Sequence, residues 1–516
     1  MQGSEQINIL QNRIAELELE NKNLHETVAY LTKKLYGKSS ETSKALGIDK
    51  QMYLFDEAEI KADPTVTEPT LDEVNQFRRK KYLGQRKEKL DKLPHDKVIF
   101  KLNPDDLACL QCGTELKPVG EEFVRTEVAY IPAKLRVIDF FRETYECRRC
   151  KNTGSPYMEK AAMPDPVIPH SYASPASIAH IMYQKYVNAV PLYRQEADWK
   201  NLGLELKRQT MSNWILEASK EWLMPVVNLL HRKLLEEKYI HADETRIQVL
   251  NEKGRKNTSD SYMWVYGTYK DSKTPIRIFE YQPTRNGNHA KTFLEGFNGY
   301  LISDAYQGYE KVDNITRCYC WSHLRRYFVD ALPPDINQPE ATLPSQAIEY
   351  CGKLFKIEEG IENFTPDEKR KQRHERSKII LDAFWAWVDA NKETCLPKSK
   401  LAKAFGYALN QKEGLMNFLK DGNIAISNNL AENSIRPFTV GRRNWLFSGS
   451  PEGAAASAAV YSIVETAKAN GLNPYEYLRY ILKFMPGLSF NEEPEFLEDL
   501  LPWSPDVQAF CNKAEK

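Results

Sequence analysis

The chain has 516 residues, and its 71 basic residues (Lys and Arg) balance its 71 acidic residues (Asp and Glu). This length exceeds what one hydrophobic core usually supports, so several domains are expected. Zero net charge provides no general attraction to nucleic acid, so any DNA-binding surface must be local. No apolar run could span a bilayer, and no basic, apolar leader opens the sequence. We therefore expect a cytoplasmic protein without a membrane partner.

Residues 1–37 are predicted to form a leucine-zipper coiled coil. Leucine at one heptad position and mostly β-branched residues at the other favour a parallel dimer, and a buried Asn21 would fix the register. The alternative is an amphipathic helix packed on its own domain, which usually shows a wider apolar stripe. The sequence therefore favours a homodimer. The two series are Ile7, Ile14, Asn21, Val28 and Leu35, and Leu10, Leu17, Leu24 and Leu31.

Residues 38–94 are predicted to be a charged linker. Its first part is acidic and is interrupted by Pro64 and Pro69, whereas basic residues gather between Arg78 and Lys92. A basic block of this kind is either a solvated arm or an arm that holds phosphates. The sequence leaves both interpretations open.

Residues 95–160 contain two Cys-x-x-Cys pairs and are predicted to form a zinc-binding module. Four thiolates suit a closed tetrahedral Zn²⁺ site, and a redox role is the alternative. Aromatic and β-branched residues at 123–130 and 134–145 predict a hairpin that carries one pair to the other. The second pair encloses two candidate DNA contacts, Arg148 and Arg149. The expected structural Zn²⁺ ligands are Cys109, Cys112, Cys147 and Cys150.

Residues 164–236 are predicted to be helical, with helices that begin near Pro175, Pro191 and Lys207. Three short helices of this kind could form a helix-turn-helix-like DNA module. The alternative is a helical collar that packs on the next domain.

From residue 238 the spacing of apolar residues becomes that of strands. Strand, strand, strand, helix, strand, helix, strand, helix is the order of a ribonuclease-H-like fold with a mixed sheet, which we expect in residues 237–332 and 424–465. Residues 333–423 would then be a helical insertion, and residues 466–516 a C-terminal helical tail. The predicted strands are 239–250, 262–269, 276–281, 300–304 and 316–320, and the predicted helices lie near 288–297, 308–312 and 322–329.

Three acidic residues are the candidate catalytic group. Asp243 and Asp304 each close a short apolar run typical of a buried strand, and Glu432 begins a helix that Ser427 could cap. Three carboxylates brought together repel one another unless divalent cations lie between them. Two Mg²⁺ (or Mn²⁺) ions could stabilise the attacking and leaving oxygens of a phosphodiester displacement. Glu244 competes with Asp243 as a ligand, because strand alternation places only one of them inward.

Five strings resemble transposases of the insertion-sequence sixty-six family, and the resemblance spans nearly the whole chain. They are HADET at 241–245, SDAYQGY at 303–309, CWSHLRR at 320–326, NNLAENSIRP at 428–437 and GRRNWLFSGS at 441–450. The one departure is Leu324, where this family commonly has Ala. The resemblance implies that Asp243, Asp304 and Glu432 are the acidic (DDE) triad of a bacterial DNA transposase.

The resemblance also places His323 near the active site, where it would support the scissile phosphate or the sheet. Cys320 and His323 have a spacing that could ligate zinc, but a Cys-x-x-His without a second pair is a weak metal signal. Three arginines, Arg436, Arg442 and Arg443, are candidate DNA contacts beyond Glu432.

We therefore expect a transposase that binds element ends and target DNA and catalyses strand cleavage and strand transfer. Accessory proteins of the element are possible partners. The alternative is a noncatalytic, dimeric, zinc-containing DNA-binding regulator in which the carboxylates are ordinary surface acids.

Overall fold

The computed structural model describes residues 133–147, 158–333, 342–488 and 494–512, together with the single positions Lys97, Ile99, Lys117, Phe123 and Thr126. The chain divides into two compact units, and nearly all described residues belong to the one that includes residues 139–512. The architecture below is that of this unit. The expected zipper (1–37) and charged linker (38–94) lie entirely outside the described residues.

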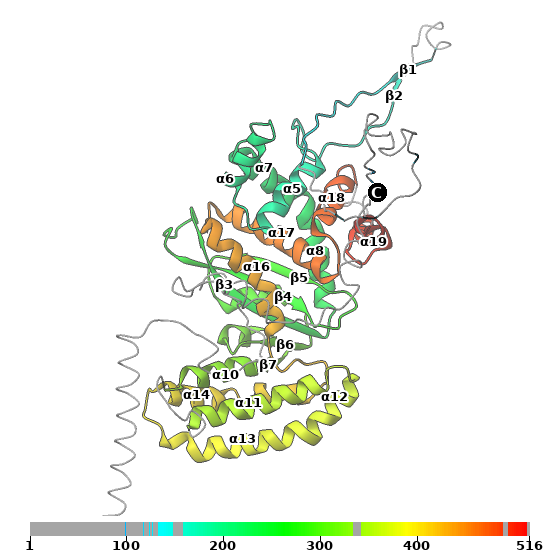
Figure 1. Cartoon of the computed structure of the whole chain (residues 1–516). Helices are drawn as coiled ribbons and strands as arrows, with labels where there is room; N and C mark the ends of the chain where they lie inside the picture. Colours follow the sequence, from blue (N-terminus) through cyan, green and yellow to red (C-terminus); the bar gives the residue numbers. More distant parts are fainter. Residues whose placement is uncertain are drawn as a thin grey trace, which may run out of the picture. The chain divides into compact units, whose positions relative to one another are not determined.

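A mixed sheet forms the centre of this unit (Figure 1). Its strand order is β5-β4-β3-β6-β7, with the short β8 paired to the far end of β3. β3 pairs antiparallel with β4 and parallel with β6 and β8, and β6 pairs parallel with β7. The bounds are β3 Tyr239–Val249, β4 Asp260–Thr268, β5 Arg277–Gln282, β6 Tyr300–Ser303, β7 Thr316–Tyr319 and β8 Phe447–Ser448.

Both faces of the sheet are covered, so β3 begins with four consecutive buried residues rather than an alternating pattern. α16 (Asn429–Trp445) packs against β3 and β4. On the other face, Phe293 of α9 (Gly287–Phe293) stacks on Tyr266 of β4 at a centroid distance of 3.9 Å. Tyr309 of the 3₁₀ helix η4 (Gln307–Lys311) meets Trp264 edge-on.

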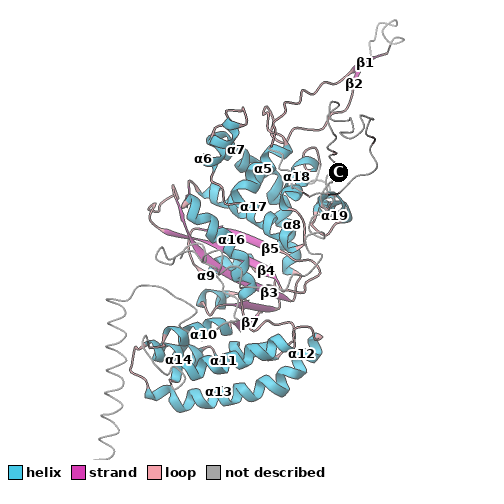
Figure 2. Ribbon diagram, in the orientation of Figure 1, coloured by secondary structure: helices cyan, strands magenta, loops and turns pink. Residues whose placement is uncertain are grey.

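The segment before the sheet is helical, as predicted (Figure 2). α5 begins at a capping box formed by Ser174 and Ser177, which confirms the expected start. These helices share one hydrophobic core with the sheet and the C-terminal helices, which is the packing expected of a collar. The elements are α5 Pro175–Tyr186, α6 Leu192–Asn201, α7 Arg208–Ala218, η3 Ser219–Leu223, α8 Met224–Leu235, α17 Pro451–Ala469, α18 Pro474–Phe484, η9 Pro494–Leu500 and α19 Pro505–Cys511.

The residues between Asp304 and Glu432 include a second helical body, which packs against the β7 edge through its own core. Trp321 lies in this core and donates its indole N–H to the Leu415 carbonyl at 2.8 Å. Trp385 and Trp387 lie on one long helix, as expected. The helices are α10 Trp321–Asp330, α11 Leu343–Gly360, α12 Pro366–Gln372, η6 Arg373–Ser377, α13 Lys378–Asn391, η7 Lys392–Thr394, α14 Lys400–Asn410, α15 Lys412–Met416 and η8 Asn417–Leu419.

The prediction of a hairpin in the cysteine module is wrong for its second half, residues 134–145. β1 (Thr144–Glu146) pairs with β2 (Met158–Lys160), further along the chain, and residues 134–143 contain no strand. Val137 and Phe141 are more than nine-tenths exposed. In the described part of this segment these apolar side chains pack against no surface, so nothing stabilises a strand here. The first half, 123–130, lies almost wholly outside the described residues.

α17 covers the open edge of β5 by side-chain hydrogen bonds. The backbone N–H groups of Phe279 and Arg277 donate to Ser462 Oγ (2.8 Å) and Thr466 Oγ1 (3.0 Å), and Asn470 Nδ2 donates to the Pro275 carbonyl (2.7 Å). Four helical residues rise about 6 Å, close to the length of two strand residues. The helix therefore bonds the alternate positions 275, 277 and 279 at the start of an edge strand that would otherwise be open to pairing.

We expect Ser462→Ala and Thr466→Val each to lower the free energy of unfolding by about 1–3 kcal/mol, because each leaves a buried backbone N–H without an acceptor. Denaturant titration of the full chain measures this. Ser434→Ala on α16 is the control, since Ser434 only donates to the Leu430 carbonyl of its own helix. If Ser462→Ala and Thr466→Val lower the free energy of unfolding no more than Ser434→Ala does, β5 does not depend on these bonds.

Candidate active site

Asp243 lies on β3, and Asp304 directly follows the neighbouring parallel strand β6. β3 and β6 are in register from the Tyr239–Tyr300 pair to the His241–Ile302 pair. Continuing this register by two residues aligns Asp243 with Asp304. Neighbouring strands are about 4.8 Å apart, so the two carboxylates are held close together.

One expectation about Asp243 requires correction. It does not end a strand but lies in the middle of β3, which continues to Val249. The parallel partner β6 ends at Ser303, one residue before Asp304. Asp243 is therefore at the rim of the parallel part of the sheet because its neighbour stops there.

Glu432 is brought to these residues by the start of α16. Asn428 precedes the helix, and its buried side-chain amide donates to the Ala242 carbonyl at 2.8 Å. Asn428 Oδ1 lies 3.0 Å from Nδ1 of the buried His241. The Glu432 backbone N–H donates to the Asn428 carbonyl, one turn back. Asn428 therefore fixes the helix start to the strand that carries Asp243.

This corrects the expected cap. The residue at the helix start is Asn428 rather than Ser427, and its side chain bonds to β3 instead of to the first turn of the helix. The motif contained the signal, because Asn is a favoured residue at helix starts. Its partner on β3 could not be read from the sequence.

The electrostatics of Asp243 show that the three carboxylates are near one another. Burial raises the pKa of Asp243 well above its usual value, and the charges of Glu244, Asp304 and Glu432 raise it further. Glu432 is 8% exposed, and its Oε1 atom has no hydrogen-bond partner. Buried carboxylates with unused oxygens are suitable ligands for a hard divalent cation.

Glu244 is buried as well, although alternation turns it to the opposite face. Its side chain is 1% exposed, accepts a hydrogen bond from Tyr309 Oη (2.7 Å) and pairs with Arg285. Arg285 Nη2 also lies 3.7 Å from Asp304 Oδ2. The prediction that only one neighbour points inward is therefore wrong, because both faces of the sheet are covered. Arg285 holds Glu244, whereas the donor to Asp243 within the described part of the chain is the backbone N–H of Glu244.

Arg317 and Arg285 were not among the predicted site residues. Arg317 Nη2 donates to the Asp304 carbonyl at 2.7 Å and to Ser303 Oγ at 2.9 Å, which fixes the chain where β6 ends. The guanidinium of Arg285 lies 4.0 Å from the Tyr306 ring centroid. Arg317 lies 13 residues after Asp304 and Arg285 lies 41 residues after Glu244, and both are outside the quoted motifs, so no local pattern indicated them.

The predicted residue His323 contacts the triad. His323 Nδ1 lies 3.7 Å from Glu432 Oε1, and Arg326 Nη2 lies 3.8 Å from Glu432 Oε2. Burial lowers the pKa of His323, so its ring is neutral at neutral pH. Cys320, His323 and Glu432 place one ligand atom each within 4.8 Å of one another. Burial raises the pKa of the Cys320 thiol to about 11.

The predicted arginines of α16 follow Glu432 along the helix. Arg442 Nη1 lies 3.4 Å from Oγ1 of Thr245, two residues beyond Asp243 on the same face of β3. Burial, and then the neighbouring Arg443, lower the pKa of Arg442. Arg443 is exposed and Arg436 is half-buried. The helix thus places Arg442 on the face of β3 that carries Asp243.

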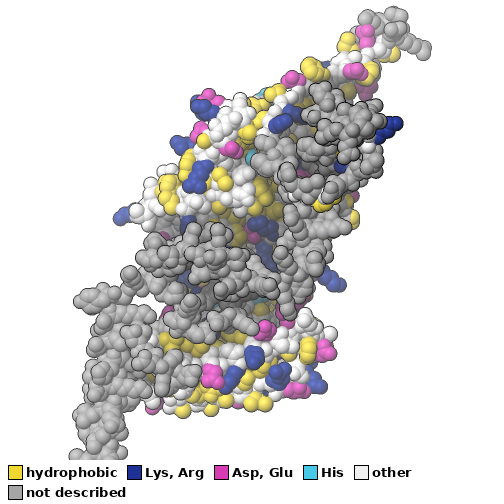
Figure 3. Space-filling view, viewed as in Figure 1, with side chains coloured by type: hydrophobic (Ala, Val, Ile, Leu, Met, Phe, Trp, Pro, Cys, Tyr) yellow, Lys and Arg dark blue, Asp and Glu magenta, His cyan; other side chains and the backbone are white. Residues whose placement is uncertain are grey.

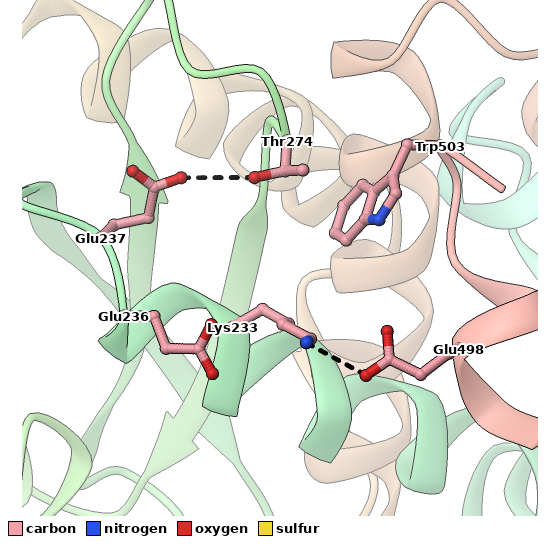
Figure 4. A pocket seen from close by; sticks show the side chains of 6 residues that line it. All are labelled: Lys233, Glu236, Glu237, Thr274, Glu498 and Trp503. Atoms are coloured by element: carbon pink, nitrogen blue, oxygen red, sulfur yellow. Dashed lines mark hydrogen bonds and ion pairs between the residues drawn. The ribbon is translucent and has the colours of Figure 1, made fainter. Parts of the chain in front are cut away.

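A separate pocket lies away from these residues (Figure 4). Lys233 pairs with Glu498 across it at 3.0 Å. Three of its six lining residues are acidic, so it does not suit a phosphate backbone. The lining residues are Lys233, Glu236, Glu237, Thr274, Glu498 and Trp503.

The described surface is mixed in charge. On the face drawn in Figure 3, Lys and Arg side chains alternate with Asp and Glu over both helical regions. None of the described helices combines the length and apolar composition needed to cross a membrane. Of the predicted zinc ligands only Cys147 is described, and Cys109, Cys112 and Cys150, with Arg148 and Arg149, lie outside the described residues.

Comparison with known proteins gives one consistent result. Residues 106–151, which hold all four predicted zinc ligands, match the zinc-finger binding domain of transposase IS66. Residues 462–503 match the IS66 C-terminal element, and residues 23–98 match a segment described as Transposase C of IS166 homeodomain. No solved structure matches the chain.

Two similar proteins come from Sinorhizobium fredii. Uncharacterized protein y4hP is 27% identical over 482 residues, which cover 87% of this chain and 84% of that protein. Uncharacterized protein y4jD is 29% identical over 425 residues, which cover 80% of each. Residues 170–456, more than half of the chain and all three acidic residues with it, match the Transposase IS66 family. The chain therefore belongs to the IS66 family of transposases.

Proposed function

We propose that this transposase binds the ends of its element and catalyses DNA strand cleavage and strand transfer through Asp243, Asp304 and Glu432. One observation carries the proposal: burial raises the pKa of Asp243, and the charges of Glu244, Asp304 and Glu432 raise it further. Three carboxylates from distant parts of the sequence are thus forced together at a cost in stability. Such a cost is typical of a functional site.

The donor set fits a pair of Mg²⁺ or Mn²⁺ ions. Carboxylate oxygens are their preferred ligands, and Glu432 Oε1 accepts no hydrogen bond from the described residues. When bound, such a pair would polarise the scissile phosphate and lower the pKa of the attacking hydroxyl. Asp243 and Asp304 would hold the ions from the sheet, and Glu432 would hold them from α16.

The remaining residues of the proposed site position the triad or the DNA. Asn428 holds Glu432 at the sheet, Arg317 holds the backbone of Asp304, and Arg285 restrains Glu244. Arg436, Arg442 and Arg443 would contact phosphates beyond the triad. Arginine suits this role because it remains charged and forms paired hydrogen bonds to phosphate oxygens.

The sheet order supports a ribonuclease-H-like fold for residues 237–332 and 424–465. Three antiparallel strands followed by two parallel ones, with the first strand central, match the order expected from the sequence.

We further propose that residues 1–37 pair two protomers, since two element ends must be cut in one assembly. The alternative, a noncatalytic DNA-binding regulator, does not account for three carboxylates held together at one end of a parallel strand pair.

We expect Asp243→Asn, Asp304→Asn and Glu432→Gln each to abolish cleavage of labelled element ends, with at least a ~10³-fold loss, because each removes a charged ligand. Glu244→Gln is the matched control: it is adjacent, buried and held by Arg285 on the other face. We expect it to lower stability but to retain measurable cleavage. Equal loss in the control would assign the ligand role to Glu244, and wild-type cleavage by any triad variant would remove that residue from the mechanism.

Asp243→Asn should also stabilise the metal-free protein at neutral pH, by about 1–3 kcal/mol. The folded-state pKa of Asp243 is raised, so the folded chain binds more protons than the unfolded chain above the unfolded pKa of about 3.9. Wild-type stability therefore falls as pH rises through this window, and the variant lacks this contribution. Thermal unfolding in a chelator at several pH values measures the difference, which should vanish near pH 4.

Excess Mg²⁺ should reverse this order, because an ion that binds only the folded state stabilises it. A variant that is less stable than wild type at neutral pH in chelator would contradict the proposed repulsion.

Asn428→Ala should lower cleavage by about 10–100-fold and raise the Mg²⁺ concentration needed for half-maximal rate, because the start of α16 loses its tie to β3. A simple loss of folded protein would lower the rate without changing the Mg²⁺ dependence. Cleavage measured across a Mg²⁺ titration separates the two. An unchanged Mg²⁺ midpoint would show that Asn428 does not position Glu432.

A further inference from the structure

A second set of ligand atoms shares Glu432 with the triad. Cys320 precedes α10, His323 lies in its first turn, and Glu432 lies in the first turns of α16. Their Sγ, ring nitrogen and carboxylate oxygen all lie within 4.8 Å of one another. Three protein ligands with a remaining open position are a common arrangement for zinc.

Several polar atoms here lack partners. Glu432 Oε1, His323 Nδ1 and the Tyr407 hydroxyl are all buried and form no hydrogen bond with any residue that the structure describes. A buried polar atom left unpaired costs about 1–3 kcal/mol. His323 Nδ1 lies 3.7 Å from Glu432 Oε1, which is too far for a hydrogen bond, so neither atom satisfies the other. A cation between them would satisfy both.

Tyr407 reaches the same region from the helical insertion. Burial, then the charges of Cys320 and Asp304, raise the pKa of its hydroxyl. The Tyr407 ring stacks on Tyr327 of α10 at 4.5 Å between centroids, which fixes its direction. An unpartnered hydroxyl close to Cys320 could hydrogen-bond a water that completes the coordination of a bound ion.

Cys320 makes the set selective for a soft ion. Its Sγ accepts the Asn428 backbone N–H at 3.1 Å, and a bound metal ion would take the place of the thiol proton. Thiolate and imidazole ligands favour Zn²⁺, whereas carboxylate oxygens alone favour Mg²⁺. Arg326 lies by the other oxygen of Glu432, Oε2, and leaves Oε1 free for the ion.

We propose that Zn²⁺ binds Cys320 Sγ, His323 Nδ1 and Glu432 Oε1, releases the thiol proton to solvent, and withdraws Glu432 from the Mg²⁺ site. This regulation rests on the proposed catalytic role of Glu432. Zinc at this position is thus an inhibitor of strand cleavage, distinct from the structural zinc of the four-cysteine module.

Zinc binding is tested on the full chain without any activity measurement. Wild type, Cys320→Ser, His323→Gln and Cys318→Ser are loaded with Zn²⁺, freed of excess, and assayed for metal per folded chain. Cys318 is the matched control, since it is buried on β7 with its Sγ near the Thr316 carbonyl and outside the ligand set. The four-cysteine module contributes equally to all four proteins.

We expect Cys320→Ser and His323→Gln to hold one Zn²⁺ fewer than wild type and Cys318→Ser to hold the same number. Loading with Co²⁺ should show a weaker sulfur-to-metal absorption in Cys320→Ser than in Cys318→Ser. Equal zinc content in wild type and both ligand variants would overturn the proposal. His323→Gln, at a partly exposed position, keeps the test valid if Cys320→Ser does not fold.

Inhibition is measured as the ratio of Mg²⁺-supported cleavage with and without added Zn²⁺, for each protein against itself. We expect at least a ~10-fold fall in wild type and Cys318→Ser, and a fall of less than ~2-fold in His323→Gln. Zinc bound at Cys320 with no inhibition would overturn the regulatory part alone. Absence of cleavage by wild type in Mg²⁺ would count against the proposed function, and the metal content would still decide the site.

Discussion

The contacts of one buried residue, Asn428, hold the candidate active site together. Its amide bonds to Ala242 and His241 of β3, and its backbone N–H bonds to Cys320 before α10. Three segments that are remote in sequence meet at this residue. A buried amide bonded on every side is costly to disturb, because each lost bond leaves an unpaired polar group. Asn428 therefore gives Glu432 a fixed starting point at the sheet.

The site also stores unfavourable electrostatic energy. Burial raises the pKa of Asp243, and the charges of three neighbouring carboxylates raise it further. The group that donates a hydrogen bond to Asp243 is nevertheless a backbone N–H and not a cationic side chain. Glu244, one residue away, has Arg285 and Tyr309 as partners. The contrast between adjacent residues separates a structural carboxylate from one available to a ligand. Glu244 is stabilised by its partners and Asp243 is left available to a ligand because the two side chains lie on opposite faces of the same strand.

The strands could be predicted from the sequence for a physical reason. Residues 239–242 are apolar or buried on both faces, and such runs are recognisable without tertiary information. The start of α5 was equally clear, because Ser174 and Pro175 carry local capping chemistry. Local signals also indicated that Glu432 lies near the start of a helix.

Other features could not be predicted because they depend on packing between distant segments. The burial of Glu244 requires Tyr309 on its face of the sheet, and the cover on β5 requires Ser462 and Thr466 nearly two hundred residues later. The strand expected at 134–143 failed for the converse reason, since its apolar side chains remain exposed. The spacing of apolar residues in the sequence indicates where an apolar face exists, but it does not indicate which segment covers that face.

The helical insertion has a consequence for the site beyond filling a long interval. The chain leaves the sheet at Cys320, and on its return Ile426 accepts the Trp321 backbone N–H at 3.0 Å. The two ends of the insertion are therefore bonded to each other directly beside Asn428. Arg373 supports this return by bonding the Phe418 and Asp421 carbonyls, at 2.8 Å each, while it pairs with Glu358. The position of Glu432 at the sheet thus depends on a separate hydrophobic core, and the insertion is part of the scaffold that assembles the three carboxylates.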